Sequence, residues 1–81
     1  MAEVRMFGPV RVAAGASREA IDAPTVERLL STLVTRHGPD FGALLTTCAI
    51  YVNGERAESN AHPLTADDEV ALLPPVSGGG A

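Results

Sequence analysis

The clearest pattern along the chain is a helical stripe of apolar residues near its middle. Five of them lie at positions i, i+3, i+4, i+7 and i+8 and so share one helix face: Val26, Leu29, Leu30, Leu33 and Val34. Thr25 can cap this helix through its side-chain oxygen, and Gly38 can adopt the left-handed conformation that ends a helix. Pro39 cannot continue it. The pattern predicts an amphipathic helix over residues 26–37.

Strands are predicted where apolar and polar residues alternate before and after this helix. Cys48, Ile50 and Val52 alternate with Ala49 and Tyr51. The pair Asn53-Gly54 then matches a type I′ hairpin turn, in which both central residues need positive φ. The expected strands are residues 3–7, 17–22, 48–52, 56–58 and 69–73, and the expected short helical turns are residues 10–14 and 40–45.

The order of these elements defines the expected fold class. Two strands that pair as a hairpin, a helix that crosses the sheet, and then further strands make the β-grasp pattern of ubiquitin-like domains. We therefore expect an α+β fold, with a mixed sheet of four to five strands packed on one main helix. Pro74-Pro75 stop the last strand, so residues 1–75 are expected to form the domain and residues 76–81 an extended, flexible, glycine-rich tail.

Composition narrows the classes of function. The chain has 81 residues and a formal charge of −4, and its six basic residues are all arginine. It therefore has no excess of positive charge with which to bind nucleic acid. One cysteine excludes an internal disulfide, and two histidines argue against a structural zinc site. No apolar run approaches the roughly 20 residues of a membrane span, and no signal peptide is recognisable. We expect a cytoplasmic protein with no bound metal or cofactor.

Few residues inside the expected domain suggest chemistry. Cys48 alternates with core positions and lacks a basic neighbour, which favours a buried small hydrophobe over a nucleophile. His37 is interpreted as a partner of the helix C-terminus and His62 as a surface residue, rather than as an acid–base pair. The acidic cluster 67–69 is interpreted as a solvated turn, because a metal would require more ligands.

The tail differs from the rest of the chain because three consecutive glycines follow the end of the last strand. A glycine-rich end is often no more than a flexible terminus. Here, however, Val76 to Gly79 would reach about 12–14 Å past the body in extended form. Without side chains it could enter a narrow tunnel in another protein. Its terminal carboxylate would then be the reactive group of a carrier.

The sequence from Leu72 to Gly79, preceded by Asp68-Glu-Val70, resembles the C-terminal signature of the MoaD/ThiS family of ubiquitin-fold sulfur carriers. The body is also similar at Tyr51-Val-Asn-Gly54 and at Pro63-Leu64. The Pro-Pro-Val-Ser-Gly-Gly run favours the MoaD branch, which serves molybdopterin synthesis. The resemblance covers the whole chain.

The resemblance implies that partner proteins catalyse the reaction steps and that this chain supplies the tail on which they act. A MoeB-like enzyme uses ATP to adenylate the terminal glycine, and a sulfur donor converts the adenylate to a thiocarboxylate. A MoaE-like large subunit of molybdopterin synthase then receives the tail, and the carrier itself binds no cofactor. Gly79 would carry the sulfur, Gly78 would give steric access, and Pro75, Val76, Ser77 and Gly80 would contact partners.

The chain departs from the family pattern at its end. The family ends at the diglycine, whereas Gly80 and Ala81 follow here. A peptidase could trim both residues, the working pair could shift to Gly79-Gly80, or this copy could be inactive as a carrier; counting from Pro74-Pro75 favours Gly78-Gly79. Two other functions stay open: a sulfur carrier for thiamine or cysteine synthesis, and a β-grasp interaction module that carries no sulfur. A lysine-free protein modifier could not form chains on itself through lysine.

Overall fold

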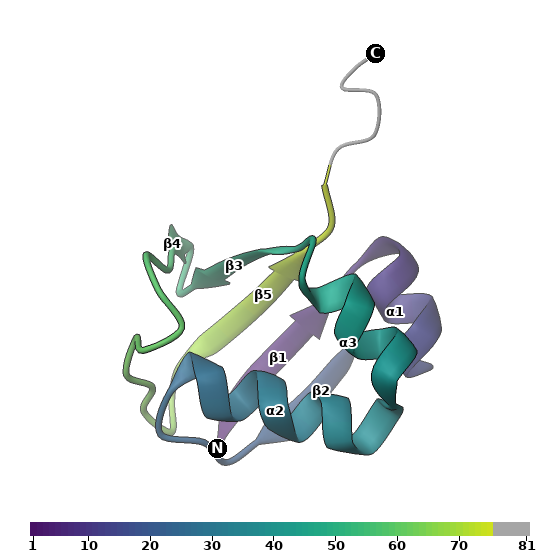
Figure 1. The fold of residues 1–81 in the computed structure, drawn as a ribbon. Coiled ribbons are helices and arrows are strands. Elements are labelled where there is room, and N and C mark those ends of the chain that lie inside the picture. Colours follow the sequence, from purple (N-terminus) through teal and green to yellow (C-terminus); the bar gives the residue numbers. More distant parts are fainter. Residues whose placement is uncertain (76–81) are drawn as a thin grey trace.

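Residues 1–75, the part of the chain that the computed structural model describes, form a mixed sheet with helices on one face (Figure 1). The strands lie in the order β2-β1-β5-β3-β4, with β1 and β5 parallel and the other neighbours antiparallel. The strands are β1 (Ala2–Met6), β2 (Arg18–Ile21), β3 (Ala49–Val52), β4 (Glu55–Arg56) and β5 (Glu69–Leu73). The helices are α1 (Gly8–Ala14), α2 (Val26–His37) and α3 (Pro39–Leu45). The expected β-grasp fold is confirmed.

Helix α2 forms over the predicted residues. The Thr25 side chain accepts a hydrogen bond from the Arg28 backbone N–H at 3.2 Å, as a capping residue does. The loop after β4 supplies two further acceptors, because the Val26 and Glu27 N–H groups donate to the His62 and Asn60 carbonyls. The exposed donors of the first turn are therefore satisfied within the domain.

The prediction for Gly38 is wrong in one respect. Gly38 has φ 99° but ψ 175°, so it does not adopt the left-handed helical conformation. The chain turns directly into α3, whose first turn accommodates Pro39, and the extended ψ redirects the backbone between the two helices. The helix ends where the sequence indicates, but α3 follows without an intervening loop.

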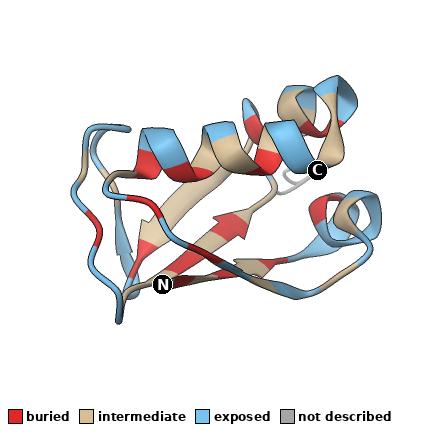
Figure 2. Ribbon diagram, turned by 90° about the horizontal axis from the view of Figure 1, so that it is seen from below, coloured by how far each residue is buried: buried red, intermediate tan, exposed pale blue. Residues whose placement is uncertain are grey.

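The core lies between α2, α3 and the sheet. Its most buried side chains alternate along the two central strands, at Val4 and Met6 of β1 and at Val70 and Leu72 of β5. Figure 2 shows buried positions along the face of α2 that is turned toward these strands. Phe41 of α3 is 1% exposed and is the largest of the fully buried side chains. The opposite face of the sheet has no helix over it (Figure 2).

The β3–β4 hairpin has the predicted turn. Asn53 has φ 52° and Gly54 has φ 85°, as a type I′ turn requires. The return strand is Glu55–Arg56 and not the predicted residues 56–58, because a two-residue turn places Glu55 opposite Val52 and the pairing ends at Arg56. The turn residue Asn53 also bridges to the start of β5, where its Oδ1 accepts the Glu69 N–H at 2.9 Å.

Asp68 connects this hairpin to the loop before β5, and its titration is expected to affect stability. Its carboxylate accepts the Thr65 backbone N–H at 2.8 Å and the Asn53 side-chain N–H at 2.9 Å. These bonds, the Thr65 bond first, lower the pKa of Asp68 below its ordinary 3.8. These hydrogen bonds stabilise the folded state fully above pH 3.8, and this stabilisation is lost as the pH falls through the lowered pKa of Asp68.

Urea unfolding between pH 6 and pH 2 measures this contribution. The wild type is expected to lose stability more steeply at low pH than Asp68→Asn, because the variant has no carboxylate to titrate at that position. Asp67→Asn is the matched control, since Asp67 is exposed on the same turn. Equal pH profiles for the wild type and Asp68→Asn would contradict the assignment.

Candidate functional site: the exit of β5 and the open sheet face

The end of β5 is where the chain leaves the sheet (Figure 1). Leu73 is the last strand residue, and Pro74 and Pro75 follow it, the first partly buried and the second exposed. Pro74 lies close to Gly8, so that a Cβ at Gly8 would be 3.2 Å from Pro74 Cγ. Gly8 also has φ +56°, so a side chain there would be both crowded and strained. The start of α1 therefore helps to define the exit.

Only one of the predicted site residues is described by the structure. Pro75 lies at the exit and is exposed, and its role as a partner contact stays a prediction. The others lie outside the described residues: Val76, Ser77, Gly78, Gly79 and Gly80. Their assigned roles, and the predicted flexible tail of residues 76–81, stay predictions.

A hollow of about 490 Å³ borders the exit. It is lined from three directions, by the end of α3, by β3 with β4, and by the exit itself. Its lining includes Thr46, Thr47, Tyr51, Arg56, Leu73 and Pro75. The apolar surface of Leu73 and the two prolines thus lies beside the phenol of Tyr51 and the guanidinium of Arg56. The sequence pattern does not predict this hollow.

The open face of the sheet is polar at one end. Strand register places one residue from each strand in a single transverse row: Arg18, Arg5, Ala71, Tyr51 and Arg56. Glu3 and Glu69 lie in the next row, away from the exit, and pair with Arg5 at 3.5 and 2.6 Å. Arg18 also pairs with Glu3, at 3.5 Å. Exposed pairs of this kind contribute about 0–1 kcal/mol each, so the face is electrically balanced at this end rather than strongly stabilised.

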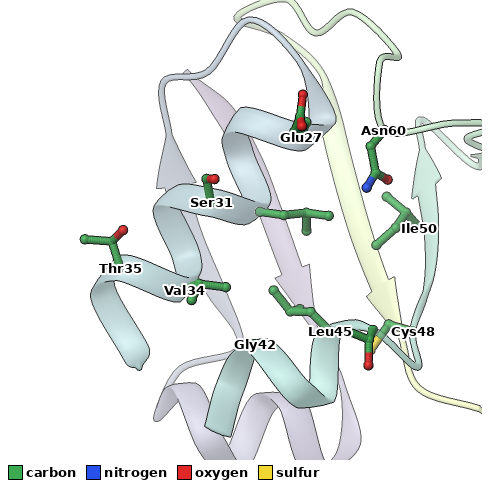
Figure 3. A pocket seen from close by; sticks show the side chains of 11 residues that line it. Glu27, Ser31, Val34, Thr35, Gly42, Leu45, Cys48, Ile50 and Asn60 are labelled. Carbon is green, nitrogen blue, oxygen red and sulfur yellow. The ribbon is translucent and has the colours of Figure 1, made fainter. Parts of the chain in front are cut away.

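A second hollow lies on the helix side of the sheet, between α2, α3 and β3 (Figure 3). It has a volume of about 570 Å³, and Val34, Leu45 and Ile50 line its apolar part. Glu27 and Asn60 lie at the end near the start of α2. No histidine lines it, so it offers room for an apolar group but no acid–base pair.

Cys48 borders both hollows and is half-buried. Its thiol donates a hydrogen bond to the Leu44 carbonyl, with Sγ 3.4 Å from the oxygen. Burial raises the pKa of the Cys48 thiol above its ordinary value, which keeps it protonated at neutral pH. This agrees with its interpretation as a small apolar residue packed at the edge of the core.

The two histidines lie at opposite ends of α2. His37 is in the last turn, where its Nε2 lies 2.6 Å from Glu19 Oε2 and its ring lies 4.8 Å from that of Phe41. The His62 carbonyl accepts from Val26 at the first turn. A helix of 12 residues separates these ends by about 16–18 Å. They therefore form no acid–base pair, as predicted. The hydrogen bond between His37 and Glu19, which anchors α2 to β2, was not predicted.

Two further findings concern residues 1–75. The structure brings together no group of three or more histidine, cysteine, aspartate or glutamate side chains in this range that could hold a metal ion. None of the helices within it has the length and apolar character needed to cross a membrane.

The ThiS family model matches residues 4–79, so the match extends through the body and ends at Gly79. The chain belongs to the ThiS/MoaD family. It is 37% identical to the molybdopterin synthase sulfur carrier subunit of Escherichia coli K12 over 81 residues, covering 98% of this chain and 100% of the relative.

Two solved structures extend the comparison within the family. One is the complex of subunits 1 and 2 of molybdopterin-converting factor from Helicobacter pylori, with 31% identity, 96% of this chain and 97% of that chain covered, and a TM-score of 0.72. The other is small archaeal modifier protein 1 of Haloferax volcanii, with 34% identity, coverage of 96% and 98%, and a TM-score of 0.73.

Proposed function

We propose that this chain is a sulfur carrier for molybdopterin synthesis, with Gly79 as the residue that is adenylated and then converted to a thiocarboxylate. The observation that carries the proposal is the 37% identity over the whole length of a molybdopterin synthase sulfur carrier subunit. The end of the family match at Gly79 supports this residue as the acceptor. In this role the chain is the small subunit of a synthase whose catalytic groups belong to other proteins.

The chemistry requires partners because a carboxylate is a poor electrophile. Adenylation by a MoeB-like enzyme gives the Gly79 carbonyl a good leaving group, AMP, at the cost of one ATP. A sulfur donor then displaces AMP to leave a thiocarboxylate, which is an anionic, soft nucleophile. A MoaE-like large subunit takes up the tail, and the thiocarboxylate sulfur forms a bond to the pterin precursor there. Water then cleaves the bond between that sulfur and the Gly79 carbonyl, which returns Gly79 as a carboxylate. Gly78 would allow the narrow approach that these steps need.

The body supports this role through its surface rather than through reactive groups. The chain leaves β5 at an exit bordered by apolar residues, next to a sheet face with no helix over it. A partner that binds the tail can therefore also cover Leu73, Tyr51 and the prolines. Pro75 would fix the direction of the tail, and Val76, Ser77 and Gly80 would contact the partner.

Removal of Gly80 and Ala81 is part of the proposal. While the Gly79 carbonyl is in a peptide bond with Gly80, it has no carboxylate to adenylate. A processing peptidase that cleaves after Gly79 is therefore required before the tail can be adenylated.

A second role uses the same activated tail. The 34% likeness to a small archaeal modifier protein favours it, because an amine of another protein could take the place of the sulfur donor. In that role the product is an amide between Gly79 and the target.

Intact-mass spectrometry of the protein from its native host tests these roles. A sulfur carrier is expected as a chain that has lost Gly80-Ala81 and has gained the mass difference between one sulfur and one oxygen. Conjugates to other proteins would indicate the modifier role. Only full-length, unmodified chain in cells that are making molybdenum cofactor would contradict the proposal.

A further inference from the structure

Arg56 is a cation without an acidic partner at the exit of β5. It is exposed on the edge strand β4 and lies opposite Tyr51, in the hollow that Leu73 and Pro75 also line. It forms no ion pair with any residue of the described range 1–75.

The other arginines of the open face are neutralised. Arg5 pairs with Glu3 and Glu69, and Arg18 pairs with Glu3. Within residues 1–75, Arg56 is therefore the one arginine of the transverse row that forms no ion pair, although Glu55 and Glu58 line a neighbouring hollow with it. The chain as a whole carries a net charge of −4. Three arginines form no ion pair within residues 1–75, namely Arg11, Arg28 and Arg56, and of these only Arg56 lines the hollow at the exit of β5.

We propose that Arg56 pairs with an aspartate or glutamate on the enzyme that receives the tail, at the mouth of the channel into which the tail is inserted. This inference rests on the proposed function, since it requires that the tail be inserted into a partner. A guanidinium presents donors in a planar fork and matches a carboxylate with two parallel hydrogen bonds. Tyr51 and the apolar residues of the hollow would shield this pair from water on one side.

A protein carboxylate fits the site better than a small anion does. Small anions are held by several converging donors, such as backbone N–H groups or a cluster of cations. The lining of the hollow contains a single cation, Arg56. A carboxylate fixed on a partner does not need such a cage, because the rest of the interface holds it in place.

The pair would determine the orientation of the carrier. The tail alone leaves the body free to rotate about the axis of insertion. A contact at Arg56, to one side of the exit, selects one rotation. The acidic remainder of the chain would repel the same carboxylate in the other rotations.

Binding of the chain to the large molybdopterin synthase subunit and to the adenylating enzyme of the same organism tests this contact. The variants are Arg56→Glu, Arg56→Gln and Arg56→Lys, with Arg28→Glu as the matched control. Arg28 is also exposed and without an ion pair within residues 1–75, but it lies on α2, on the other side of the sheet. Titration calorimetry at 50 and 500 mM salt gives the affinities, and thermal unfolding checks that each variant is folded.

Arg56→Glu is expected to weaken binding to at least one of the two enzymes by about 30-fold at low salt, and Arg56→Gln by about 3- to 10-fold, with smaller losses at high salt. Arg56→Lys keeps the charge but cannot form the two parallel hydrogen bonds, so it is expected to weaken binding, though by less than Arg56→Gln. Arg28→Glu is expected to remain within about threefold of the wild type. Reversing the charge of the partner carboxylate should restore binding of Arg56→Glu. Wild-type affinity of folded Arg56→Glu and Arg56→Gln for both enzymes would overturn the inference alone. A chain that ends at Gly79, with Arg56 intact, that binds neither enzyme would overturn the proposed function and the inference with it.

Discussion

A chain that ends at Gly79 is expected to be adenylated at least about 100-fold faster than the chain that ends at Ala81. The adenylating enzyme must place one carboxylate in line with the α-phosphate of ATP, and misplacement of a reacting group by about 1 Å can already cost about 100-fold. Two additional residues displace the carboxylate by about 7 Å in extended form. Ala81 also adds a methyl group where a glycine would leave space.

Four chains that end at Gly78, Gly79, Gly80 and Ala81 measure this effect. ATP–pyrophosphate exchange reports adenylation, and intact mass reports the thiocarboxylate after the sulfur donor is added. The chain ending at Gly80 distinguishes the two registers, because it also ends in two glycines. Faster reaction of that chain would move the acceptor to Gly80. Equal rates for the chains ending at Gly79 and Ala81 would contradict the need for trimming.

The elements that the sequence predicts well are those whose causes are local. The stripe on α2, its Thr25 cap and the Asn53-Gly54 turn depend on residues within a few positions of one another. Their geometry follows from helix periodicity and from the φ values that the turn requires. The structure confirms all three.

Long-range pairing is less accessible from the sequence. Residues 3–6 of β1 lie parallel to residues 69–72 of β5, and alternation in each strand gives the face of a residue but not its neighbour. The ion pair between Arg5 and Glu69 depends on that pairing. The conformation of Gly38 was also missed, because Pro39 can either follow a finished helix or begin a new one.

The candidate site shows the same difference between features that the sequence predicts and features that require the assembled fold. The reactive residues of the tail were predicted from a resemblance, since three glycines by themselves indicate no chemistry. The hollow beside the exit requires the sheet to be assembled, because it joins α3, β3, β4 and β5. One signal was present in the sequence: a two-residue turn at Asn53-Gly54 necessarily places Arg56 opposite Tyr51.

Phe41→Ala is expected to lower the free energy of unfolding by about 3–5 kcal/mol, because it removes a buried aromatic ring and leaves a cavity. Phe41 is 1% exposed and packs on His37, whose partner Glu19 anchors α2 to the edge strand β2. A domain of 81 residues has a total stability of about 4–12 kcal/mol. The loss is thus a large part of the whole, and a substantial unfolded fraction is expected at 37 °C.

Urea unfolding measures this loss against two controls. Phe41→Leu keeps most of the buried volume and is expected to cost less than about 1.5 kcal/mol. Phe7→Ala removes the same ring from a position that is 42% exposed, and a loss below about 1 kcal/mol is expected there. Similar losses for Phe41→Ala and Phe7→Ala would contradict the placement of the core. Because the proposed acceptor Gly79 follows the core in the sequence and does not form part of it, Phe41→Ala should reduce the yield of thiocarboxylate in proportion to the unfolded fraction. Removal of Gly79, by contrast, should abolish thiocarboxylate formation on a folded body.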